Sequence, residues 1–216
     1  MKTLYDSGIK KLTKEISTQK RKIQYVEVQE EPDHKEFFRN PFVRAYRATI
    51  RTGHETLYHR HCENTVYIVL QGGCVGTETV EPKGIYPIVF MKSFRLFTKI
   101  QWGLRNLFLK DVNMPNGFTF LLLHNRCPVI HKAVASKNNL MDIEMMGIEI
   151  FGKAKPHTAE LLPSPLVLEY RADNFCISAL KLAHGESYKV LDKNACLIIG
   201  RKFTLCGASR CGFRSF

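Results

Sequence analysis

Two histidines separated by a single residue, His59 and His61, are the residues of this 216-residue sequence whose type and spacing best suit chemistry. Residues i and i+2 of a β-strand point to the same face, so in a strand the two imidazoles would lie side by side. Paired imidazoles suit a transition metal that takes nitrogen ligands. A pair of this kind also occurs as ordinary polar groups on a strand surface or in a pocket, and both interpretations remain open.

The residues around the pair follow a recognisable spacing. Five residues separate Gly53 from His59, and the apolar run 66–70 is followed by Gly72. This arrangement resembles the first motif of the cupin superfamily, which reads G, five residues, H-x-H, three or four residues, E, six residues, G. The resemblance implies that His59 and His61 are metal ligands on a strand inside a small β-barrel.

The chain departs from that motif at one ligand. Seven residues before Gly72, where the family usually has a metal-binding glutamate, this sequence has Thr65. Glu63 lies two residues too early to take its place. The resemblance therefore implies a site without the charged fourth ligand, and so a lower metal affinity than in a cupin that keeps its glutamate.

A second region resembles the second cupin motif, which reads P-x-G, two residues, H, three residues, N. Here Pro128-x-x-His131 precedes a short predicted strand, an Asn-rich turn and the run 142–150. The motif glycine is absent, and Ala135 stands in place of the asparagine. The resemblance implies that His131 is the third ligand, with His124 on the preceding strand as the alternative. We interpret the other histidines as ordinary structural or surface groups: His34, His54, His157 and His184.

The implied ligand set of His59, His61 and His131 is similar to the three-histidine iron centre of the thiol dioxygenases. It would hold a divalent transition metal (Fe, Ni or Zn) and favour an anionic substrate. One implied function is thus a metal-binding cupin that acts as a dioxygenase-like oxidoreductase on a small organic molecule. The alternatives are a non-catalytic cupin that binds a small anionic ligand, and a structural or interaction protein. No catalytic residue is assigned, and whether the chain is an enzyme stays open.

The elements that must position these residues are mostly strands. Period-two alternation and short apolar runs predict strands at 23–28, 42–50, 57–62, 66–70, 75–80 and 118–123. We expect Val66, Ile68 and Leu70 to share one face. The resemblance implies an all-β double-stranded β-helix, or jelly-roll barrel. Apolar residues at helical spacing among lysines predict a short amphipathic helix within residues 1–24.

The domain organisation follows from these elements. We expect residues 1–36 to be a helical arm with the first strand and 153–165 to be a linker rich in Lys, Pro and Ser. The resemblance implies that 37–152 are the cupin barrel. Residues 166–216 resemble a degenerate, partial second cupin, as in bicupins. Ser187 and Lys189 occupy the places of the motif histidines, so no metal is expected there. Residues 85–115 are either additional core strands or a lid or dimer contact that presents Phe94, Phe97 and Trp102.

The composition limits which binding partners and which cellular location we expect. The 32 Lys and Arg residues exceed the 20 Asp and Glu residues and give a net charge of +12, but they are spread out, which makes nucleic acid an unlikely ligand. We expect no transmembrane helix or secretory signal, because no apolar run is long enough. Seven cysteines without a CxxC pair are typical of reduced thiols, and we expect a cytoplasmic protein. A half barrel would leave strand edges exposed, so a homodimer is expected.

Overall fold

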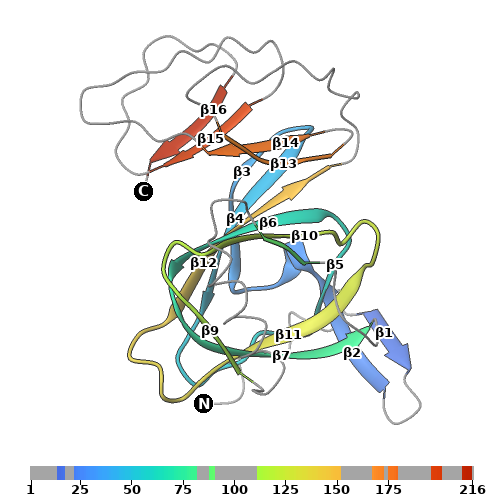
Figure 1. The fold of residues 1–216 in the computed structure, drawn as a ribbon. Helices are drawn as coiled ribbons and strands as arrows, with labels where there is room; N and C mark the ends of the chain where they lie inside the picture. Colours follow the sequence, from blue (N-terminus) through green and yellow to red (C-terminus); the bar gives the residue numbers. More distant parts are fainter. Residues whose placement is uncertain are drawn as a thin grey trace.

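The computed structural model describes residues 14–17, 22–81, 88–90, 111–151, 167–172, 175–179, 196–200 and 211–215. Nearly all regular structure in this part of the chain is β-strand. Two six-stranded sheets face each other and form the two halves of a barrel (Figure 1). The all-β jelly-roll class predicted from the sequence is confirmed.

The first sheet has the strand order β1-β2-β5-β11-β7-β9. Its strands are Lys14–Ser17 (β1), Lys22–Glu27 (β2), His59–His61 (β5), Val129–Ala135 (β11), Gly73–Glu81 (β7) and Asp111–Met114 (β9). Neighbours pair antiparallel except β2 and β5, which run parallel. The turn η2 (Val28–Glu30) leads from this sheet into the second one.

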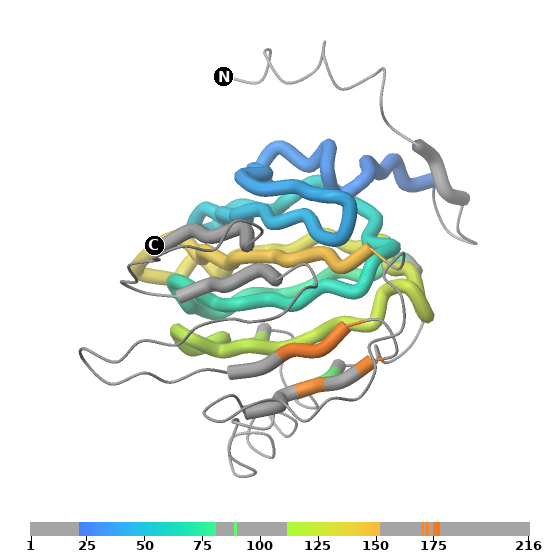
Figure 2. The backbone as a smooth tube through the Cα atoms, turned by 90° about the horizontal axis from the view of Figure 1, so that it is seen from above, coloured from blue at the N-terminus to red at the C-terminus, as the bar shows by residue number. Residues whose placement is uncertain are grey.

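The second sheet has the order β3-β4-β12-β6-β10-β8, and all of its pairs are antiparallel. Its strands are His34–Arg39 (β3), Val43–Ile50 (β4), Ile143–Ile150 (β12), Asn64–Gln71 (β6), Thr119–Leu122 (β10) and Ile88–Phe90 (β8). From β4 to β12 successive strands therefore alternate between the two sheets, which is the jelly-roll arrangement. Figure 2 shows the strands of the barrel running side by side across the view.

One apolar cluster fills part of the space between the sheets. It contains Tyr67 and Val69 of β6, Val75 of β7 and Ala133 of β11, so both sheets contribute to it. Because side chains alternate along a strand, the residues between these point the other way. Val66 is buried in a second cluster on the outer face, and Ile68 and Leu70 pack against that cluster, which confirms their predicted common face.

A hairpin in the C-terminal region packs against this outer face. The hairpin of β13 (Val167–Arg171) and β14 (Cys176–Ala179) places Tyr170 and Ile177 against the outer cluster. A parallel pair, β15 (Cys196–Gly200) and β16 (Cys211–Ser215), completes the described residues (Figure 1). The described C-terminal strands thus form separate two-stranded sheets, with the hairpin packed on the barrel.

Two predictions about the ends of the barrel can be compared with the structure. The helix predicted for 1–24 is wrong at residues 14–17 and 22–24, which are strand, because Ile16 pairs with Ile23 across β1 and β2. At the two ends of the 85–115 region, β8 and β9 are edge strands, which favours the interpretation as additional core strands.

Several residues named in the sequence analysis lie outside the described residues: Phe94, Phe97, Trp102, Ser187, Lys189 and the 153–165 linker. No helix among those described is long and apolar enough to cross a membrane.

Gly147 of β12 allows an aromatic ring to enter the barrel. It lies directly opposite Tyr46 of β4, and a Cβ atom at Gly147 would come within 2.2 Å of Cζ of that tyrosine ring. The tyrosine is almost fully buried, so its ring has little room to move. The absence of a side chain at this position is therefore a packing requirement.

We expect Gly147→Ala to lower the free energy of unfolding by about 1–3 kcal/mol, because it overpacks a filled interior. In a Tyr46→Leu background the same change should cost less, since the obstructing ring atoms are gone. Urea denaturation of the four variants of this double-mutant cycle measures the coupling. Equal costs of Gly147→Ala in both backgrounds would contradict the role assigned to the ring.

Candidate metal centre

His59, His61 and His131 meet inside the barrel on two neighbouring strands. β5 carries the first two, and β11 pairs with it antiparallel so that His131 lies directly opposite His59. One donor atom from each of the three side chains lies within 4.8 Å of the other two. His59 and His61 are each only 1% exposed. The convergence of histidines implied by the two sequence motifs is therefore present.

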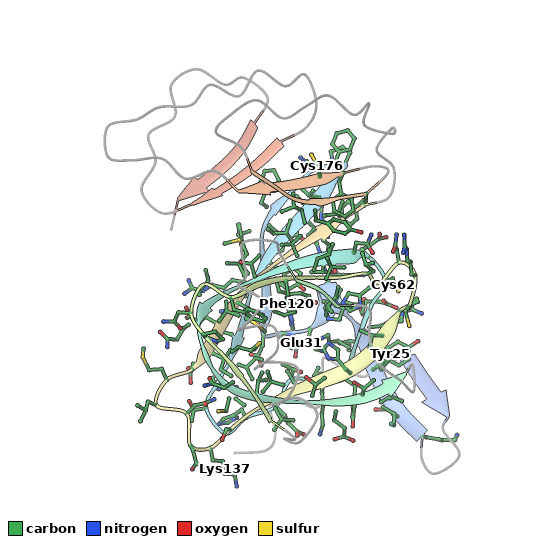
Figure 3. All side chains as sticks on the ribbon, in the orientation of Figure 1. Tyr25, Glu31, Cys62, Phe120, Lys137 and Cys176 are labelled. Carbon is green, nitrogen blue, oxygen red and sulfur yellow. The ribbon has the colours of Figure 1, made fainter. Side chains whose placement is uncertain are left out.

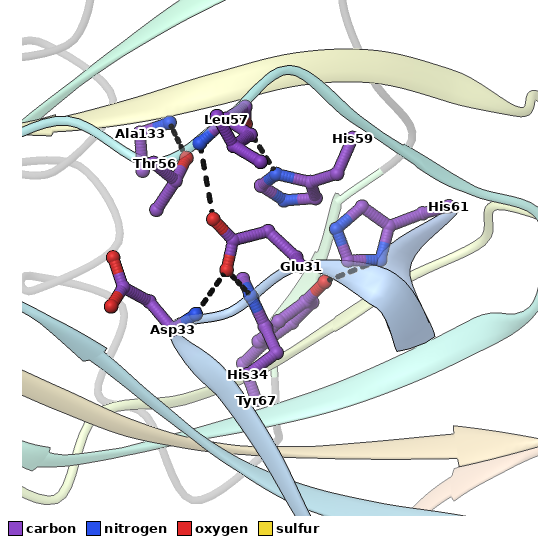
Figure 4. Close-up of polar contacts among 9 residues, drawn as sticks. All are labelled: Glu31, Asp33, His34, Thr56, Leu57, His59, His61, Tyr67 and Ala133. Carbon is purple, nitrogen blue, oxygen red and sulfur yellow. Dashed lines mark hydrogen bonds and ion pairs between the residues drawn. The ribbon is translucent and has the colours of Figure 1, made fainter. Parts of the chain in front are cut away.

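Hydrogen bonds orient two of these rings. Nδ1 of His59 donates to the carbonyl oxygen of Leu57 over 2.8 Å, which leaves the lone pair on Nε2 (Figure 4). Nδ1 of His61 lies 3.3 Å from the hydroxyl oxygen of Tyr67, so its Nε2 is outside this contact. Backbone and hydroxyl partners of this kind fix the orientation of metal-binding imidazoles.

The third ring carries a buried nitrogen without a partner. Nε2 of His131 makes no hydrogen bond to any described residue. A buried polar nitrogen in this state is costly unless a water or an ion satisfies it. This donor set and this unsatisfied atom fit a metal ion that takes nitrogen ligands.

The surroundings keep the three imidazoles neutral. Burial lowers the pKa of His59 to about 3, and the neighbouring His34 acts in the same direction. Burial, followed by the neighbouring histidines, holds the pKa of His61 and of His131 well below the ordinary value. Neutral imidazole is the form that binds a metal, so the site needs no proton release near neutral pH.

His124, the alternative ligand, lies beside this group. Its ring stacks on His61 with centroids 4.9 Å apart and an angle of 21° between the planes. It is buried, its Nε2 has no partner among the described residues, and burial lowers its pKa to about 4. His124 therefore lines the site, while His131 is the residue whose donor atom joins those of His59 and His61.

Thr65 occupies the position of the missing glutamate and cannot replace it. The residue is fully buried, and its hydroxyl donates to the backbone oxygen of Glu63 over 2.9 Å. The site therefore has no carboxylate ligand from this strand, as the sequence resemblance implies.

The sequence analysis missed two residues of the site, Glu31 and His34. Figure 3 shows Glu31 in the middle of the barrel, and its carboxylate lies 3.0 Å from Nδ1 of His34. The ring of His34, interpreted from the sequence as an ordinary structural or surface group, lies 4.8 Å from that of His59 and so lines the site. Burial raises the pKa of Glu31, but the bonds to His34 and to the Leu57 amide outweigh it and hold this pKa below the ordinary value.

A buried ion pair continues this polar interior. Nη2 of Arg44 lies 2.7 Å from a carboxylate oxygen of Glu149, and both side chains are at most 4% exposed. The guanidinium packs over the ring of Tyr46, which in turn lies against His34. Nε of Arg44, the hydroxyl of Tyr46 and one oxygen of Glu149 have no hydrogen-bond partner among the described residues. The interior thus offers polar atoms for a small ligand beyond the histidines.

Strand order defines a jelly-roll barrel, and the histidine group lies inside it. Neither a protein-family model nor a curated protein matches the sequence. Partial similarity is found to solved structures described as cupins. A cupin domain from Bordetella pertussis Tohama I is 17% identical, with a TM-score of 0.37, over 55% of this chain and 92% of its own.

Two further structures show similarity of the same order. A cupin-like protein from Thermotoga maritima MSB8 is 14% identical, with a TM-score of 0.30, over 50% of this chain and 56% of its own. A cupin 2 domain-containing protein from Halorhodospira halophila is 10% identical, with a TM-score of 0.33, over 64% and 75%. At these values the class of fold rests on the strand topology of the chain itself, and the bicupin organisation stays a prediction.

Proposed function

We propose that this protein binds a divalent transition metal (Fe, Ni or Zn) through His59, His61 and His131 and uses it on a small molecule inside the barrel. The observation that carries the proposal is the mutual proximity of three neutral imidazole donors. His59 and His61 are buried, and the buried Nε2 of His131 has no other described partner. Three protein ligands leave further coordination positions for a substrate. Such an ion supplies Lewis-acid chemistry or, as iron, redox chemistry.

Arg44 supports an acidic ligand for the same interior. A buried guanidinium with an unpartnered Nε suits a carboxylate or a similar small anion. The proposed reaction is a dioxygenase-like oxidation of a small organic acid, in which Arg44 and Tyr46 orient the ligand. A barrel that binds such an acid without turnover is the second candidate, favoured by the same arginine. A homodimer and a cytoplasmic location stay predictions.

Metal binding should be visible as thermal stabilisation. A ligand that binds only the folded state adds about 2.7 kcal/mol at a hundredfold excess over its Kd. For a chain of this size that corresponds to a rise in Tm of about 5–10 °C. We expect Tm to rise with Fe(II), Ni(II) or Zn(II) and to return to its starting value after a chelator is added.

His59→Ala and His131→Ala should abolish this response, because each removes a donor. His54→Ala and Glu63→Ala are the controls, since His54 is exposed and neither residue belongs to the histidine group. If wild-type protein shows no metal-linked shift and elemental analysis finds no metal, the proposal fails. If metal does bind, dioxygen uptake with Fe(II) and a panel of small organic acids separates the catalytic candidate from the ligand-binding candidate.

A further inference from the structure

The interior provides a carboxylate–histidine pair that belongs to neither sequence motif. Glu31 follows η2, and His34 is the first residue of β3, so both come from the connection between the two sheets. Their side chains are buried, with 1% of Glu31 and 7% of His34 exposed. Thr65 offers no charged ligand, so an additional donor must come from elsewhere in the interior. The Glu31–His34 pair is one described source, besides His124, whose ring stacks on His61.

Glu31 is held in place by three hydrogen bonds, all visible in Figure 4. One oxygen accepts from the backbone N–H of Leu57 over 3.0 Å, and the other accepts from the backbone N–H of Asp33 over 2.6 Å. The latter oxygen also contacts Nδ1 of His34 over 3.0 Å. A carboxylate can only accept here, so Nδ1 of His34 donates, and Nε2 is the nitrogen outside this contact.

The ring of His34 extends the arrangement of the three ligand histidines. Its centroid lies 4.8 Å from that of His59, which falls within the 4.7–5.1 Å range found among the three ligand rings. The centroid of the His34 ring lies 6.3 Å from that of His61. On β4, the strand that pairs with β3, the buried ring of Tyr46 lies 5.0 Å from the ring of His34. His34 is thus a fourth imidazole that packs directly against a ligand.

We propose that His34 is the fourth nitrogen donor of the metal centre and that Glu31 is the residue that positions it. This inference rests on the proposed metal site and extends it to a four-nitrogen set, which suits Zn(II), Ni(II) or Cu(II). A carboxylate that accepts a hydrogen bond from the other nitrogen of a ligating imidazole fixes its tautomer and raises its basicity. The buried negative charge of Glu31 also offsets the cation, as the glutamate absent at Thr65 would have done.

Cu(II) is the probe for the test, because its electron paramagnetic resonance spectrum reports the number of coordinated nitrogens. His34→Asn is the central variant: its amide can still donate to Glu31, but it has no second ring nitrogen. We expect it to reduce Cu(II) affinity at least tenfold in a competition titration and to remove one nitrogen coupling from the spectrum. Glu31→Gln should reduce affinity by about 10- to 100-fold. His54→Ala, at an exposed position, should change neither quantity.

The outcomes separate this inference from the function on which it rests. If wild-type protein binds Cu(II) and His34→Asn keeps both its affinity and its spectrum, His34 is not a ligand, while the three-histidine site stands. If wild-type protein binds no Cu(II), both are overturned. Circular dichroism of each variant establishes that it is folded, and His34→Gln serves as a second variant if His34→Asn is not.

Discussion

Acidification is expected to unfold the metal-free protein steeply between pH 6.5 and pH 4. The pKa of His59 is lowered to about 3 and that of His124 to about 4, whereas both residues would titrate at 6.5 when unfolded. The unfolded chain therefore binds protons in this interval that the folded chain does not. Each such histidine removes about 1.4 kcal/mol of stability per pH unit as the pH falls.

The two histidines together account for about 2.7 kcal/mol per pH unit, and His61 and His131 act in the same direction. This is large against a typical total stability of about 5–15 kcal/mol. Glu31, whose pKa is lowered, adds a further loss below pH 4.5, whereas Glu149, whose pKa is raised by burial, acts in the opposite direction. The histidine contribution dominates because four groups share its sign.

Urea denaturation at several pH values, with a chelator present throughout, measures this slope. His124→Gln should reduce the slope by about 1.4 kcal/mol per pH unit, because one titrating group is removed. The exposed His54 provides the control, and His54→Ala should leave the slope unchanged. A free energy of unfolding that stays flat between pH 6.5 and pH 4.5 would show that the histidines are not buried as described.

Glu149→Ala is expected to lower the free energy of unfolding by about 3–5 kcal/mol. The change leaves Arg44 as an unpaired charge between the two sheets, and a buried charge without its partner is strongly destabilising. The double variant Arg44→Met, Glu149→Leu should recover most of this loss. It removes both charges and places apolar side chains of similar size in the same space.

The ion pair of Arg39 and Glu36 provides a matched comparison. Its contact distance is also 2.7 Å, but its side chains are 50% and 39% exposed. Glu36→Ala should therefore cost less than about 1 kcal/mol. Equal costs for Glu149→Ala and Glu36→Ala in guanidinium denaturation would contradict the argument that burial, and not contact distance, sets the contribution of the inner pair.

The sequence predicted the parts of this fold that depend on local periodicity. The residue pattern of β4 and β6 identified the strands and the shared face of Val66 and Ile68, because successive side chains of a strand point to opposite faces. The pair His59 and His61 was identified for the same reason. Their meeting with His131 was predicted only from the resemblance, because antiparallel pairing of β5 and β11 connects residues about 70 positions apart.

The parts that the sequence did not predict depend on long-range contacts. Glu31 and His34 lie outside the strands predicted from the sequence, and nothing in their spacing shows that a hydrogen bond to Leu57 draws them into the barrel. Residues 14–17 belong to the stretch 1–24, whose apolar side chains have helical spacing, yet pairing with β2 makes them strand. In both cases a partner distant in space or sequence outweighs the local pattern.

The direct pairing of His59 with His131 makes metal affinity a reporter of strand registration. β5 is only three residues long, and a slip of one residue against β11 would exchange the two faces of the strand. Arg60 would then face the interior, and both motif histidines would face outward. A misregistered barrel could still contain sheet and still look folded by circular dichroism, but it would have lost its ligands. Metal occupancy would therefore distinguish correctly assembled molecules from near-native misfolded ones in a single preparation.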